Sequence, residues 1–401
     1  MKYKIFYVIF LITCFIYPFE YVIGPIAIRH IFAFIMLVWL VSIKQVKSDR
    51  NIWLYLSYLF CATLSSFLTG YIGTFLPALI GTFFLCIILY YATKAMILKF
   101  NALSWIITAL VSLAIIDSIV TIAQFYNSPI ARIIADTLRV SLIDEETWSQ
   151  LDFSGGAVGG LTAVGLLRGV KNGYFLSAAV VLVLYSKKDK IKIYNWLLMP
   201  IILFALFVTQ ERAAFFLGSI SVLSYIMINS WRKTRQISEV LLVTLIFFAV
   251  FEFLGLADSF SFSDTRYDIL GSEATGREKF FSDAMTYVLI HPLGGMSAYL
   301  AQGGYPPHHF IPNSFLYGGI IGGLIVTFLV ALQIFISIKV LYESFIKKKY
   351  SMIVVAMAII YLSYTGSSCF HNLALATGDE SFFLWWAILS SQLYKENNMV
   401  V

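Results

Sequence analysis

The chain has 401 residues, of which 60% are hydrophobic and 12% are charged, and its formal net charge is +6. Soluble globular domains carry about 25% charged residues, so this composition excludes a soluble protein and indicates a polytopic helical membrane protein. The cysteines lack the spacing of a metal site or a disulfide framework. We expect no nucleic-acid partner.

Apolar stretches recur along the whole chain, and each becomes long enough to cross a bilayer once its flanks are included. They cover residues 5–17, 26–43, 52–69, 76–92, 103–125, 175–185, 196–208, 213–228, 240–254, 315–338, 352–362 and 382–393. We predict an all-α fold of about 12 transmembrane helices, forming one integral membrane domain over residues 1–401. No small-residue cleavage site follows the first stretch, so we expect it to be retained.

Lysines fall at every second connection between these stretches. With the amino terminus inside, the clusters around Lys4, Lys47, Lys188 and Lys348 all lie on the cytoplasmic side, as the positive-inside rule requires, and both termini are cytoplasmic. The outer side holds mostly arginine, including Arg29. Because a guanidinium fork suits phosphate and carboxylate, this bias suggests an anionic partner. Two long outer loops, 127–172 and 256–312, have room for a site.

The first of these loops ends in Arg168-Gly-Val-Lys-Asn172-Gly-Tyr-Phe, which opens the next span. Arg168 and Lys171 could be interfacial anchors or substrate contacts.

A short outer connection, Thr209-Gln-Glu211-Arg212-Ala-Ala214, follows two spans later. Glu211 and Arg212 could neutralise each other. Alternatively, Arg212 begins a helix whose free N–H groups and guanidinium make an anion site.

The second loop contains Arg266 and a predicted amphipathic helix from Thr275 to His291, which Pro292 ends. Arg277 lies in the first turn of this helix, where a basic side chain opposes the helix dipole, so we assign it a functional role. His291 suits the last turn electrostatically and could be a helix-terminal residue only.

The same loop ends in Tyr-Pro-Pro-His308-His309-Phe-Ile-Pro-Asn313. The paired histidines could bind a metal, but no carboxylate or cysteine stands at ligand spacing. A neutral histidine that removes a hydroxyl proton is the better chemical use.

The order of these motifs resembles the O-antigen polymerase and O-antigen ligase superfamily. The succession is Arg168-Gly with Asn172, Thr-Gln-Glu-Arg212-Ala, Thr-Gly-Arg277 with His291-Pro-Leu-Gly-Gly, and Asn313-Ser-Phe-Leu with Gly319 and Gly322. The resemblance implies a fold similar to type C glycosyltransferases in the bacterial inner membrane. It also implies a periplasmic active site, a donor linked to undecaprenyl pyrophosphate, and no cofactor or metal.

By that resemblance Arg212 and Arg277, assisted by Arg168, hold the pyrophosphate, and His309 takes the proton from the acceptor hydroxyl. Glu211, His308, Asn313, His291 and Arg266 complete the expected substrate-binding set. The family often has His directly before the asparagine, whereas Pro312 stands there in this chain, so His308 and His291 remain alternatives to His309 as the base. Membrane lipids and a chain-length regulator protein are further candidate partners.

Three activities are open at this point. The chain could be a polymerase that joins lipid-linked repeat units, which we favour because the outer loops hold aromatic and charged residues suited to sugars. It could be a ligase that passes the glycan to the lipid A core. A flippase or transporter of the lipid-linked sugar would need charges deep within spans, where Asp117 is the main example.

Overall fold

The structure is a computed structural model, and the part of the chain that it describes is helical. The described residues are 2–16, 28–44, 49–70, 81, 83–125, 171–186, 194–209, 212–232, 279–304, 310–368 and 379–399. No strand occurs among them.

The helices, in chain order, overlap the predicted apolar stretches where these are described, and α15 is a short further helix; the stretch 240–254 lies outside the described residues. They are α1 (Lys2–Phe15), α2 (Ile28–Ser42), α3 (Arg50–Leu68), the π-helical turn η2 (Phe83–Ile87), α5 (Ile88–Phe100), α6 (Leu103–Phe125), α9 (Lys171–Ser186), α10 (Tyr194–Val208), α11 (Arg212–Arg232), α15 (Met296–Ala301), α16 (Phe310–Lys347), α17 (Met352–Ser368) and α18 (Glu380–Met399).

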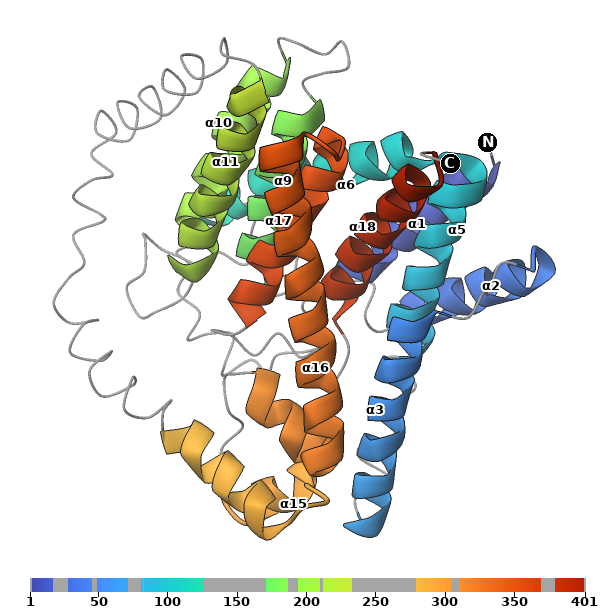
Figure 1. Ribbon diagram of the computed structural model, residues 1–401, viewed down its shortest axis with the longest axis vertical. Helices are drawn as coiled ribbons and strands as arrows, with labels where there is room; N and C mark the ends of the chain where they lie inside the picture. The colour runs from blue at the N-terminus through green and yellow to red at the C-terminus, as the bar shows by residue number, and fades with distance from the viewer. Residues whose placement is uncertain are drawn as a thin grey trace, which may run out of the picture.

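One large core joins most of these helices (Figure 1). In it α9 packs against α6, α10, α11 and α17, and α17 also contacts α16 and α18. The helix α18 also packs against α5. The helix α17 therefore lies between the α9 group of helices and the α18–α5 pair. Large aromatic side chains such as Tyr90, Trp385 and Trp386 are fully buried there.

The helix α16 is broken at Gly319, which has φ 65° and ψ −169°. The ring of Phe315 lies against Gly323, although eight residues of unbroken helix would separate them by about 12 Å. The chain therefore folds back on itself at Gly319, and α16 consists of a short arm, residues 310–318, and a long arm, residues 320–347. This corrects the expectation of one continuous span over 315–338.

Small residues let α16 approach α3 closely. A Cβ added to Gly318 would lie 2.9 Å from the Tyr58 ring, and one added to Gly322 would lie 3.2 Å from Cβ of Cys61. Close backbone contact through glycine is typical of helix pairs in membranes, where dispersion rather than water exclusion stabilises the contact.

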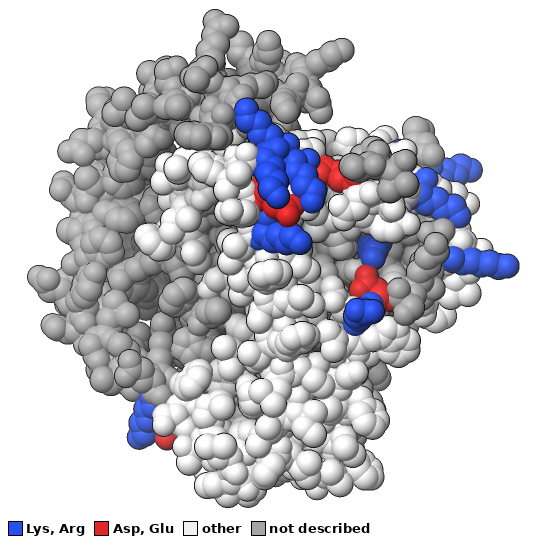
Figure 2. Space-filling model, in the orientation of Figure 1, with Lys and Arg blue, Asp and Glu red and all other residues white. Residues whose placement is uncertain are grey.

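Three of the described helices are long and apolar enough to cross a bilayer: α3, α6 and α16. The long arm of α16 turns Phe328, Phe335 and Tyr342 outward at helical spacing, each at least 60% exposed. In Figure 2 the surface over the lower parts of α3 and α16 carries almost no charge, whereas charged side chains gather in the upper half of this face. These features are consistent with a membrane protein.

Candidate functional site

The structure interlocks the third and fourth sequence motifs at the break in α16. The Gly295 N–H donates to the carbonyl of Leu316 (2.7 Å), and the Ile320 N–H donates to the carbonyl of Pro292 (2.9 Å). A Cβ at Gly294 would lie 2.6 Å from the same Leu316 oxygen. The His291-Pro-Leu-Gly-Gly turn thus inserts into the fold-back at Gly319, and both sets of glycines are needed for the backbones to meet.

Residues 279–290 are helical and Pro292 follows the helix, as predicted. Together with the turn and α15, this helix forms the 279–304 unit. Its buried residues, among them Ala284, Val288 and Tyr299, share a small core with Phe315 and Leu316 on the short arm of α16. His291 is exposed, and its ring lies 4.5 Å from the ring of Tyr287, which in turn meets Tyr299 edge-on at 5.1 Å. The unit therefore holds His291 close to the fold-back.

Asn313 lies on the short arm of α16, 1% exposed, and Ser314 beside it is fully buried. The Ser314 hydroxyl donates to the carbonyl of Phe310 (2.7 Å), which adds a bond within the short arm.

The helices that begin in the first and second motifs, α9 and α11, also pack against each other. The Asn172 side chain, buried at the start of α9, donates to Oγ1 of Thr121 on α6 (3.0 Å). Five residues later, the Ser177 hydroxyl lies within hydrogen-bond distance of two carbonyls, that of Gly173 in its own helix (2.9 Å) and that of Ala214 in α11 (2.8 Å). The helix α11 begins at Arg212, as predicted, so the beginnings of α9 and α11 lie side by side.

A small cavity of about 10 Å³ lies between α9, α11 and α17, directly behind this contact. It is lined by hydroxyl-bearing side chains, among them Tyr174, Ser177, Ser221 and Tyr364. Its size and polarity suit a single buried water molecule.

Most of the predicted site residues cannot be placed. Arg168, Glu211, Arg266, Arg277, His308 and His309 lie outside the described residues, as does the side chain of Arg212. Among the predicted set, the structure positions the side chains of Asn313 and His291. It brings their segments together through the Gly319 break, which the sequence analysis did not identify; the Gly-Gly pairs at 294–295 and 318–319 were its only signal.

Arg29 belongs to the arginines that suggested an anionic partner, but it has a partner within the chain. Its guanidinium donates to Glu380 Oε1 at 3.3 Å, with both side chains mostly buried. This pair links α2 to the start of α18, where Asp379 accepts from the backbone N–H of Ser381. Arg29 therefore has a structural role.

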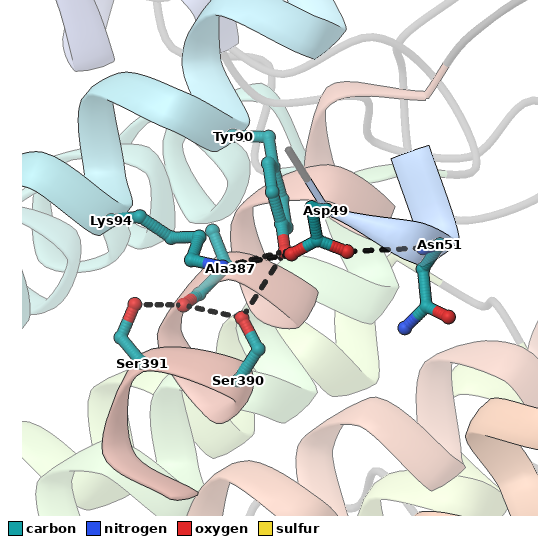
Figure 3. Close-up of polar contacts among 7 residues, drawn as sticks. All are labelled: Asp49, Asn51, Tyr90, Lys94, Ala387, Ser390 and Ser391. Atoms are coloured by element: carbon teal, nitrogen blue, oxygen red, sulfur yellow. Dashed lines mark hydrogen bonds and ion pairs between the residues drawn. The ribbon is translucent and has the colours of Figure 1, made fainter. Parts of the chain in front are cut away.

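A second polar cluster joins α3, α5 and α18 (Figure 3). Asp49 caps α3 by accepting from the Asn51 N–H (3.0 Å), and its other oxygen accepts from Lys94 (2.8 Å) and from the Tyr90 hydroxyl (2.6 Å). Burial favours the neutral carboxyl, but these hydrogen bonds and the Lys94 charge outweigh it, so the pKa of Asp49 is lowered. The sequence pattern predicts this region only as a cluster of cytoplasmic charges.

Comparison with protein-family models and with curated proteins finds no match for this chain.

Proposed function

We propose that this protein is an inner-membrane glycosyltransferase of about 12 spans with a type C arrangement. It would polymerise oligosaccharide repeat units carried on undecaprenyl pyrophosphate, at the periplasmic face. The proposal rests on the ordered succession of four motifs in the sequence. The contacts between the segments that carry those motifs support it. The helices that begin in the first and second motifs, α9 and α11, pack together, and the third motif meets the fourth at Gly319.

The proposed reaction is a single displacement. The acceptor hydroxyl oxygen attacks the anomeric carbon of the donor sugar, the bond from that carbon to the pyrophosphate oxygen breaks, and the lipid pyrophosphate leaves with the electron pair. His309 takes the proton from the attacking hydroxyl. Arg212 and Arg277, with Arg168, stabilise the charge that grows on the leaving oxygen. The anomeric carbon is inverted.

The direct test uses purified protein in lipid vesicles with a lipid-linked repeat unit alone, and then with lipid A core added. Chain growth without the core supports the polymerase, and transfer only in the presence of the core identifies a ligase instead. Movement of the lipid-linked sugar across the vesicle without any new glycosidic bond would identify a flippase. The last two outcomes refute the proposal.

Variants at the two ends of α11 test the arginine assignment. Arg212→Lys keeps the charge but loses the bidentate fork, whereas Arg232→Lys makes the same change at the other end of the helix. We expect Arg212→Ala to lower kcat by a factor corresponding to about 2 to 4 kcal/mol, and Arg212→Lys to recover only part of it. Equal activity of the Arg212→Lys and Arg232→Lys proteins would show that Arg212 does not bind the pyrophosphate through its guanidinium fork.

The base is tested with single alanine variants of three histidines. His309→Ala should abolish turnover while insertion into the membrane is unchanged. An active His309→Ala protein beside an inactive His308→Ala or His291→Ala protein would reassign the base.

A further inference from the structure

The tip of the 279–304 unit exposes large apolar side chains. Leu289 is 71% exposed, Ile290 is 68% exposed and Leu293, in the turn, is 53% exposed. They lie together at the carboxyl end of the 279–290 helix and in the turn that follows it. Exposed apolar residues that cluster in this way mark an interaction surface, whereas scattered ones need no explanation.

The other sides of the same helix have different partners. Ala284 and Val288 are buried in the core of the unit. Ser282, Asp283 and Thr286, nearer the amino end, are polar and exposed. Near the amino end the exposed side of the helix therefore carries these polar residues and the partly exposed Phe281 (37%), whereas at the carboxyl end, about 10 Å away, it is apolar.

Backbone hydrogen bonds place the apolar end beside a candidate membrane span. The Gly295 N–H donates to Leu316, on the short arm of α16, and the Pro292 carbonyl accepts from Ile320, at the start of the long arm. Ile321 there is 68% exposed, and Leu324 and Phe328 continue the same exposed apolar surface along the arm. In Figure 2 this lower part of the face is uncharged apart from a small group at its lower left. The tip therefore lies next to the start of the span, and both expose apolar side chains.

We propose that the tip of the 279–304 unit is inserted among the lipid acyl chains of the leaflet at this end of the molecule, with Leu289, Ile290 and Leu293 facing lipid. The exposed polar residues Ser282 and Thr286 then lie nearer the headgroups. The inference rests on α16 crossing the bilayer and is independent of the proposed chemistry.

Spin labelling of the full chain in phosphatidylcholine vesicles tests this placement. Leu289→Cys, Ile290→Cys and Leu293→Cys are compared with Ser282→Cys and Thr286→Cys on the same helix, and with Ile321→Cys on α16, after replacement of the native cysteines. Frequent collisions of the spin label with oxygen indicate a lipid environment, and frequent collisions with a water-soluble nickel chelate indicate exposure to water. We expect the ratio of the oxygen collision rate to the nickel collision rate to be at least tenfold higher at positions 289, 290, 293 and 321 than at positions 282 and 286.

Two outcomes would overturn the proposal. Nickel accessibility at 289, 290 and 293 equal to that at 282 would place the tip in water. Weak collisions with both reagents would mean that protein, such as a second copy of the chain, covers the tip.

A photoreactive diazirine side chain at position 289, in the chain with its native cysteines, gives an independent measurement. It should form lipid adducts that the same group at position 282 does not form, and equal lipid labelling at the two positions would contradict the proposal.

Discussion

Substitution of Gly319 tests the interlock between the 279–304 unit and α16. Gly319 has φ 65° and ψ −169°, a region that only glycine adopts readily, so Gly319→Ala costs about 1 to 3 kcal/mol in backbone strain. The new Cβ would also lie 2.5 Å from the Pro292 oxygen and 2.7 Å from the carbonyl carbon of Leu293. Relieving this clash separates the two backbones that are joined by two hydrogen bonds.

Each of those bonds contributes about 0.5 to 1.5 kcal/mol net, so the whole substitution should destabilise the fold by about 2 to 6 kcal/mol. The matched control is Gly303→Ala. Gly303 also has a positive φ, 82°, but a Cβ there would meet nothing within 4 Å. The control therefore measures the backbone cost alone, about 1 to 2 kcal/mol.

The assay is unfolding in mixed micelles by titration with sodium dodecyl sulfate, followed by circular dichroism. Gly319→Ala should lose clearly more stability than Gly303→Ala. If the two variants lose the same free energy within about 0.5 kcal/mol, which is the usual limit for additive effects, the fold-back and its two hydrogen bonds do not stabilise the protein as described.

Further predictions concern the two polar contacts between helices. Asp49→Ala should destabilise the protein by about 1 to 3 kcal/mol in the same titration, whereas Asp49→Asn, which keeps the helix cap, should cost less; equal losses would mean that the cap is unimportant. Because the pKa of Asp49 is lowered on folding, its contribution is present at neutral pH and is lost as the pH falls through that lowered value, so acid should destabilise the wild type more than Asp49→Asn. A parallel acid response in both proteins would contradict this assignment. Ser177→Ala should cost about 0.5 to 1.5 kcal/mol because the hydrogen bond from α9 to the Ala214 carbonyl of α11 is lost, while Ser57→Ala, an exposed serine bonded only within its own helix, should be nearly neutral.

The helical class and the approximate helix positions follow from the sequence because they depend on local composition. An apolar stretch of membrane length leaves few alternatives to a helix, since every backbone polar group must be bonded within the segment. The start of α11 at Arg212 and the end of the 279–290 helix before Pro292 were predicted for equally local reasons. Proline cannot continue a helix without the loss of a backbone bond.

The candidate site was predictable only as an ordered set of motifs. Arg29 shows the limit: its charge and predicted side suggested an anionic ligand, but Glu380, 351 residues away, is the group that it contacts. Whether an arginine is available to a substrate depends on such distant partners, which a charge pattern along the chain does not contain.

The sequence by itself determined that this is a helical protein with membrane-length apolar segments, because hydrophobicity over about 20 residues is a local property. The tertiary structure decided that α16 folds back at Gly319 and that the turn at Pro292 enters the break. Glycine permits this conformation but also permits a straight helix. The choice is made by the backbone of a separate segment, whose carbonyl at Pro292 accepts the N–H that the break leaves free at Ile320.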